Sequence, residues 1–130
     1  MDFNTLTQKS QEAVSDAQNI AITRGHTEVD GEHLLLSLLE QQEGLIPRLM
    51  NKMDVSPDAV REAVEAELEQ RPRVSGPGVE PGNIHLSQRL SKILVEAERQ
   101  ASRLKDEYVS TEHLFMVLID EGSSSASGRI

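Results

Sequence analysis

The sequence predicts an all-α domain built from two tandem helical repeats, the second of them incomplete. Apolar residues recur at helical spacing along most of the 130 residues. The segment 6–40 returns at 86–120, an offset of 80 without a gap. A run rich in proline and glycine separates the two copies. We therefore expect one domain, 1–130, with repeat 1 at 1–70, a connector at 71–85 and repeat 2 at 86–130.

The first helix is predicted between Thr7 and Gly25. The hydroxyl of Thr7 can accept a hydrogen bond from a backbone N–H at the helix start, and glycine suits the position where a helix stops. The apolar residues between them fall on one stripe, which predicts the buried face. They are Ala13, Val14, Ala17, Ile20 and Ala21.

The second helix is predicted to start after Asp30 and to be buried all round, because its leucines leave almost no polar side. These are Leu34, Leu35, Leu36, Leu38 and Leu39. A short third helix is predicted from Leu45 to about Lys52, since Pro47 is tolerated in a first turn.

The fourth helix is predicted to open at Ser56-Pro57, because serine is a good N-cap and proline suits the first helical position. Its predicted buried face consists of Val60, Ala63, Val64 and Leu68.

The connector follows. Between Pro72 and Gly82 lie three of the five prolines and three of the eight glycines, a composition that excludes a helix interior. A phosphate-binding loop would need a Gly-Lys-Ser/Thr sequence and free backbone N–H groups, and this run offers no such lysine. We interpret it as a linker.

The repeat rests on two motifs at the same offset. Leu6-Thr7-Gln8-Lys9 returns as Leu86-Ser87-Gln88-Arg89, and a Val-x-x-Glu-His-Leu motif stands at 29–34 and again at 109–114. Nine of the 35 aligned positions are identical, where about two would match by chance. Residues 47–49 correspond to 128–130 at an offset of 81, so the second copy is expected to stop as its third helix begins. The chain is therefore expected to be a piece of a longer protein. Its C-terminal residues, from Ser123 on, are expected to be frayed.

Composition excludes several functions. The formal net charge is −9, which argues against a sequence-independent grip on nucleic acid and against an anionic membrane surface. There is no cysteine, so disulfides and thiolate chemistry are excluded. The first residues have no basic segment followed by an apolar run, and no stretch has the roughly 18 apolar residues of a membrane span. These features predict a cytoplasmic domain.

Each Val-x-x-Glu-His-Leu motif carries a histidine, His33 or His113. A helical zinc site needs two histidines four residues apart, whereas these are single and lie eighty residues apart. We favour two stabilised helix starts over a metal site, with N-caps at Asp30 and Ser110 and first-turn carboxylates at Glu32 and Glu112 facing the positive end of the helix.

No catalytic arrangement is predicted. The serines do not form a nucleophile-elbow pattern, and carboxylate pairs such as Glu65 and Glu69 fit a solvated helix face. Two stacked repeats also leave an inter-repeat seam, and one lined by Leu, Ile and Val would suit a bound peptide. The alternative is that these residues are ordinary core.

The duplicated Val-x-x-Glu-His-Leu motif resembles the N-terminal domain of the Clp ATPases, most of all those of the ClpB-type disaggregating chaperones. The resemblance covers essentially the whole chain. The residues that carry it are 6–13, 16–21, 29–36, 71–76 and 103–114. The glycine-proline connector is similar to that of the ClpB type rather than to the shorter one of the ClpC type.

The resemblance implies two pseudo-twofold-related four-helix repeats, joined by a linker to two ATPase modules in a homohexameric ring. It implies a domain, monomeric on its own, that binds apolar segments of unfolded or aggregated polypeptides and feeds them to the pore together with a cooperating chaperone system. The resemblance assigns substrate handling to Thr7, Leu94, Asp106 and Glu112, although this chain has His113 where some relatives have leucine.

The resemblance also implies that ATP and magnesium bind in the ATPase modules, so that this fragment has no cofactor and no enzymatic activity of its own. An alternative remains: the adaptor-docking N-domain of a ClpC- or ClpA-type ATPase that regulates a protease. In that case a folded adaptor would bind, and unfolded chains would not.

Overall fold

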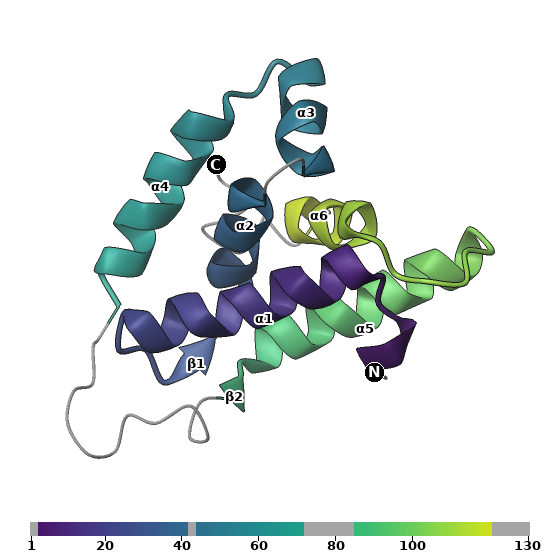
Figure 1. The fold of residues 1–130 in the computed structure, drawn as a ribbon, viewed down its shortest axis with the longest axis horizontal. Coiled ribbons are helices and arrows are strands. Elements are labelled where there is room, and N and C mark those ends of the chain that lie inside the picture. Colours follow the sequence, from purple (N-terminus) through teal and green to yellow (C-terminus); the bar gives the residue numbers. More distant parts are fainter. Residues whose placement is uncertain (1–2, 42–43, 72–84, 121–130) are drawn as a thin grey trace.

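The computed structural model describes residues 3–41, 44–71 and 85–120, and these are almost entirely helical, so the all-α prediction is confirmed (Figure 1). In chain order the elements are the short 3₁₀ helix η1 (Phe3–Thr5), α1 (Gln8–Thr23), β1 (Glu28–Val29), α2 (Gly31–Glu40), α3 (Leu45–Lys52), α4 (Pro57–Glu69), β2 (His85–Leu86), α5 (Gln88–Arg103) and α6 (Thr111–Asp120).

The predicted repeat is present in the first two helices of each copy. Helices α5 and α6 begin and end 80 residues after α1 and α2. Thr7 and Ser87 cap α1 and α5 in the same way, each accepting a hydrogen bond from the backbone N–H three residues on. The predictions for most of the connector and for the segment from Ser123 on lie outside the described residues.

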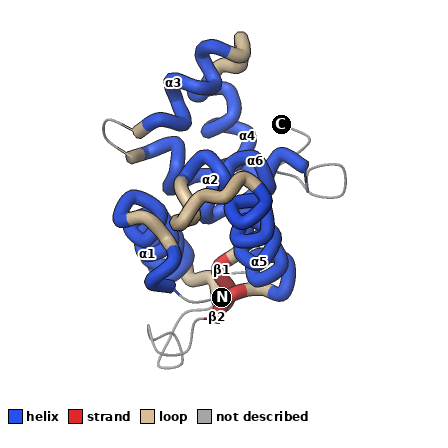
Figure 2. Tube along the Cα trace, turned by 90° about the vertical axis from the view of Figure 1, so that its right-hand side faces the viewer, coloured by secondary structure: helices blue, strands red, loops and turns tan. Residues whose placement is uncertain are grey.

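Helix α2 is the centre of the fold, and it packs against α1, α3, α4, α5 and α6. Helices α1 and α5 lie on one side of α2, while α3 and α4 lie on its far side (Figures 1 and 2). Every residue of α2 except the terminal Glu40 is buried, as its all-apolar pattern predicts. None of the helices in the described ranges is long and apolar enough to cross a membrane.

The inter-repeat seam is built from two reciprocal backbone pairings. Val29 in β1 pairs in parallel with Leu86 in β2, and Leu6 forms an isolated parallel bridge with Val109. The backbone N–H of Ser87 donates to the carbonyl of Val29 over 2.9 Å, and that of Thr7 donates to the carbonyl of Val109 over 3.0 Å. The segment before the first helix of each copy therefore pairs with the segment before the second helix of the other.

The predicted core faces are mostly confirmed. Val60, Val64 and Leu68 of α4 are buried, but Ala63 is exposed, so its predicted burial is wrong. Because α4 packs mainly on α2, only a narrow stripe at every fourth residue reaches the core. On α1, Ile20 is only half-buried.

Candidate functional site

The start of α2 is stabilised by the side chains of Asp30, its N-cap, and His33, in its first turn. The side chain of Asp30 accepts a hydrogen bond from the backbone N–H of Gly31, and His33 Nδ1 accepts one from the backbone N–H of Asp30 over 2.8 Å. The proton of His33 is therefore on Nε2, which donates to Nδ1 of His26 over 2.8 Å. The predicted role of His33 in a stabilised helix start is confirmed.

The second copy uses the same device with a different partner. His113 Nδ1 accepts from the backbone N–H of Ser110 over 2.9 Å, and its Nε2 lies 3.0 Å from a carboxylate oxygen of Asp106. Asp106 stands at the position that His26 occupies in the first copy. Among the described residues no three His, Asp or Glu side chains converge as a metal site requires.

Burial lowers the pKa of His33 to about 4, because the charged imidazolium would lose its hydration there. Repulsion from His26 when it is protonated, and from the guanidinium groups of Arg71 and Arg24, lowers the pKa further, and the Asp30 carboxylate opposes this only in part. His33 is thus neutral at physiological pH.

A buried charge cluster lies beside this histidine pair. The carboxylate of Glu32 is fully buried and accepts hydrogen bonds from Arg89 of α5 and, over 2.9 Å, from Arg71, which follows α4. Asp30 binds the same two guanidinium groups at 3.0 and 3.1 Å and the hydroxyl of Ser87 at 2.8 Å. The cluster therefore ties repeat 1 to repeat 2 next to the β1–β2 pairing.

The electrostatics of Asp30 follow from this arrangement. Burial by itself would raise its pKa, but hydrogen bonds from Gly31 and Ser87 and the charges of Arg89 and Arg71 hold the pKa below its usual range. Asp30 consequently stays ionised.

Three of the four predicted substrate-handling residues lie near one end of the seam. Thr7 is half-buried, and its backbone bond to Val109 places it beside the segment that carries Asp106 and Glu112, both of which are exposed. The fourth, Leu94, lies on α5, is only 8% exposed and belongs to the hydrophobic core of the domain. Its side chain therefore contributes to the core, and its role in substrate handling stays a prediction.

Two exposed apolar side chains accompany Asp106. Leu104 is 66% exposed and Tyr108 53% exposed, among the most exposed large hydrophobic side chains of the described residues. With Thr7, Asp106 and Glu112 they form what we call the 104–112 face. Within the described part of the chain Glu112 forms no ion pair or side-chain hydrogen bond, unlike its counterpart Glu32. This face offers apolar and acidic contacts together.

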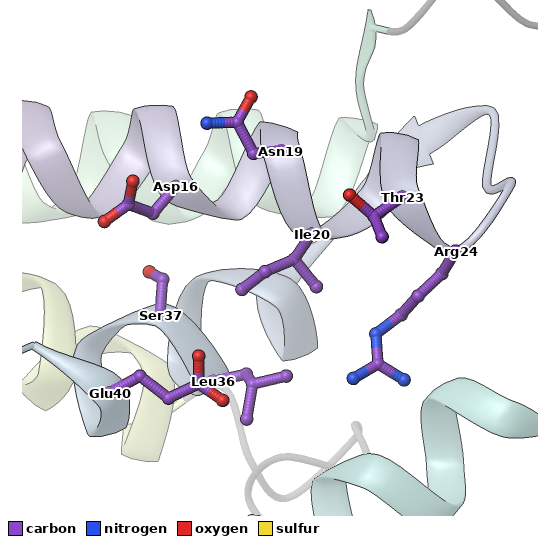
Figure 3. Close-up of a pocket in the computed structure, with 8 residues that line it drawn as sticks. All are labelled: Asp16, Asn19, Ile20, Thr23, Arg24, Leu36, Ser37 and Glu40. Atoms are coloured by element: carbon purple, nitrogen blue, oxygen red, sulfur yellow. The ribbon is translucent and has the colours of Figure 1, made fainter.

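A concave surface lies between α1 and α2 (Figure 3). This groove, which we call the α1–α2 groove, has a volume of about 360 Å³. Its apolar floor is formed by Ile20 and Leu36, and polar side chains surround it. The remaining lining residues are Asp16, Asn19, Thr23, Arg24, Ser37 and Glu40.

Sequence reasoning missed the arginines of the cluster and the partner of His33. Comparing the copies at offset 80 could have indicated them, because Arg89 stands where repeat 1 has Lys9, and Asp106 where it has His26. Arg71 has no such signal, since only the fold brings the end of α4 to the start of α2.

The chain is similar to a known protein family and to proteins of that family. A family described as "Clp repeat (R) N-terminal domain" matches residues 5–128. "Chaperone protein ClpB" of Nitratidesulfovibrio vulgaris (strain Hildenborough) is 53% identical over 130 residues, all of this chain but only 15% of that protein. The chain thus spans about 15% of the length of this curated relative.

Two solved structures are also similar. One is described as "N-terminal domain (1-163) of ClpV1 ATPase from E.coli EAEC Sci1 T6SS", with 29% identity, a TM-score of 0.81, and coverage of 93% of this chain and 71% of that one. The other is described as "Peptide from EAEC T6SS Sci1 SciI protein", with the same identity, TM-score and coverage of this chain, and 74% of its own chain covered.

Proposed function

Because the chain belongs to the Clp repeat N-terminal domain family, we propose that it is the substrate-recognition domain of an ATP-dependent protein disaggregase. It binds exposed apolar segments of unfolded or aggregated polypeptides and passes them to an ATPase ring. Its 53% identity to a chaperone named ClpB supports this proposal.

The observation that carries the proposal is the 104–112 face. Leu104 and Tyr108 expose apolar surface in the same short stretch of chain as the exposed acidic residues Asp106 and Glu112. A domain that binds many unrelated sequences needs shallow apolar surface and weak contacts, because tight selectivity requires features that reject alternatives. The net charge of −9 keeps such a surface soluble.

The rest of the assembly belongs to the same proposal. Since the chain spans about 15% of its ClpB relative, we expect ATP and magnesium to bind outside it, in the ATPase modules of a longer protein. That protein would be a cytoplasmic homohexamer working with a second chaperone system. The isolated chain would be a monomer without catalytic activity.

An NMR titration of the labelled chain tests the proposal. The probes are carboxymethylated, unfolded α-lactalbumin and the native form of the same protein. We expect shifts at Thr7, Asp106 and Glu112 with the unfolded probe only. Shifts with neither form would contradict client binding and favour the alternative, in which a folded adaptor docks here.

Matched variants locate the contact. Leu104→Ser with Tyr108→Ser removes the apolar part of the 104–112 face and should weaken binding about tenfold. Leu45→Ser with Met53→Ser removes comparable exposed apolar surface from the first residue of α3 and from the residue that follows the helix, and should leave affinity unchanged. Equal losses in both double variants would show that general surface hydrophobicity, not this face, binds the client.

A further inference from the structure

We propose that the α1–α2 groove is a second binding site, which takes a polypeptide segment carrying an arginine next to a leucine or isoleucine. The site is distinct from the 104–112 face: Thr7 precedes the first turn of α1, whereas the groove uses the second half of that helix. The inference therefore does not depend on the proposed function.

The shape of the groove defines an apolar subsite. Ile20 belongs to the buried stripe of α1 but remains half-buried, because part of its side chain lines the groove. Leu36 of α2 completes the floor, and Figure 3 shows both side chains in the middle of the groove. Leu36 is itself only 1% exposed, so an aliphatic side chain of a partner would mainly remove the exposed part of Ile20 from water.

The charges beside that floor are acidic and unneutralised. Asp16 of α1 and Glu40 of α2 are exposed on opposite walls, with Ser37 between them in Figure 3. Within the described ranges neither carboxylate forms an ion pair or a side-chain hydrogen bond. Arg24, which Figure 3 shows reaching toward α4, is already bound to Glu65 over 2.6 Å. The groove thus offers two negative charges to a partner.

The second repeat shows which group a carboxylate at this position binds. Glu96 is the counterpart of Asp16, and its carboxylate oxygens lie 3.6 Å from a guanidinium nitrogen of Arg99 and 3.5 Å from one of Arg103. In repeat 1 these arginines are replaced by Asn19 and Thr23. Repeat 1 therefore keeps the carboxylate and lacks the guanidinium, which a partner's arginine would supply.

The combined chemistry identifies the occupant. The guanidinium of an arginine can bridge two carboxylates through its fork of N–H donors, which an ammonium group does less well. An adjacent leucine or isoleucine would then lie over Ile20 and Leu36. Because the groove is shallow and its rim is exposed, each ion pair adds little, and the affinity is expected to be weak and salt-dependent.

Titrations with short peptides test this site directly on the 130-residue chain. The probe is a capped hexapeptide with one leucine beside one arginine and otherwise glycine and serine. We expect amide shifts in the second half of α1 and in α2. Replacing arginine with glutamate, or leucine with serine, should weaken binding at least about fivefold.

A self-blocking variant gives the sharpest result. Asn19→Arg with Thr23→Arg transplants the arginines of repeat 2 next to Asp16, at positions that are exposed and tolerate the change. The transplanted guanidinium groups should compete with the peptide and abolish its shifts, while the fold is retained. Unchanged peptide binding by this variant would overturn the proposal.

Charge variants provide the matched control. Asp16→Asn with Glu40→Gln should weaken binding of the hexapeptide about three- to tenfold. Glu62→Gln with Glu69→Gln makes the same net change on exposed positions of α4 and should have no effect. Equal losses would reduce the binding to general electrostatic attraction, and shifts confined to the 104–112 face would assign the peptide there; either result refutes the groove site.

Discussion

The buried rings of His33 and His26 share one hydrogen bond, donated by Nε2 of His33 to Nδ1 of His26 over 2.8 Å. The same ring of His33 accepts the backbone N–H of Asp30, the residue that binds both arginines of the buried cluster. In the second repeat the partner of the histidine is a carboxylate, Asp106, instead of a second histidine.

Acidification should destabilise the fold through His33. Its pKa is lowered from the ordinary 6.5 to about 4, so below pH 6.5 the unfolded chain binds a proton that the folded chain does not bind until near pH 4. The free energy of unfolding should therefore fall by about 3 kcal/mol from this group as pH drops through that window. Urea denaturation between pH 7 and 4 measures it.

The variant His26→Asp installs the partner found in repeat 2 and should flatten this loss, because a carboxylate favours the protonated ring. His85→Gln is the control: it removes an exposed histidine whose pairing with the exposed Glu28 should contribute little, and it should therefore change the pH slope much less than His26→Asp does. A slope unaffected by His26→Asp would show that His33 is not the responsible group.

The two first-turn glutamates should differ in their contribution to stability. Glu32→Gln leaves Arg71 and Arg89 without the buried carboxylate that they share and should cost about 3 kcal/mol or more. Glu112→Gln changes an exposed side chain and should cost under about 1 kcal/mol. Urea unfolding of both variants decides this, and similar costs would contradict the role given to the cluster.

Substitution of Leu94 with a polar residue should lower the free energy of unfolding. Leu94→Ser removes a core side chain and buries a hydroxyl, at an expected cost of about 2–5 kcal/mol. The neighbouring Val95 is 42% exposed, and Val95→Ser should change stability by less than about 1 kcal/mol. If Leu94→Ser unfolds at the same temperature as the parent chain, its placement in the core is wrong.

The turn after α5 should tolerate glycine better than its present residue. Lys105 has a φ of 61°, and its counterpart Gly25 has a φ of 75°. Because an L side chain is strained there, Lys105→Gly should stabilise the fold by up to about 1 kcal/mol, and Gly25→Ala should destabilise it by a similar amount. Thermal unfolding tests both, and a lower melting temperature for Lys105→Gly would refute the argument.

Local signals in the sequence were sufficient to predict the helices. Caps such as Thr7 and Ser56, and the apolar run of α2, depend on neighbours within a few residues, and the structure confirms them. The burial of Ala63 was predicted wrongly, because how much of a helix face reaches the core depends on where the helix lies.

The site was less predictable, because its chemistry joins distant segments. The resemblance indicated Thr7, Asp106 and Glu112, and the Leu6–Val109 pairing explains why these positions lie close together. The α1–α2 groove has no motif of its own. It depends on Asn19 and Thr23 standing where repeat 2 has Arg99 and Arg103, and only the ion pairs of Glu96 show why that difference matters.

The reciprocal pairings of Leu6 with Val109 and of Val29 with Leu86 have the form of a twofold homodimer interface, in which each partner offers the same patch. Leu6 and Leu86 are identical residues at offset 80, as are Val29 and Val109. Two separate single repeats could form the same pairings, but only at sufficient concentration. Joining them in one polypeptide makes the association intramolecular, so dilution cannot separate the halves. The two ends of the seam nevertheless differ: Glu32 binds Arg89 beside the Val29–Leu86 pairing, whereas Glu112, which follows the Leu6–Val109 pairing, forms no ion pair among the described residues.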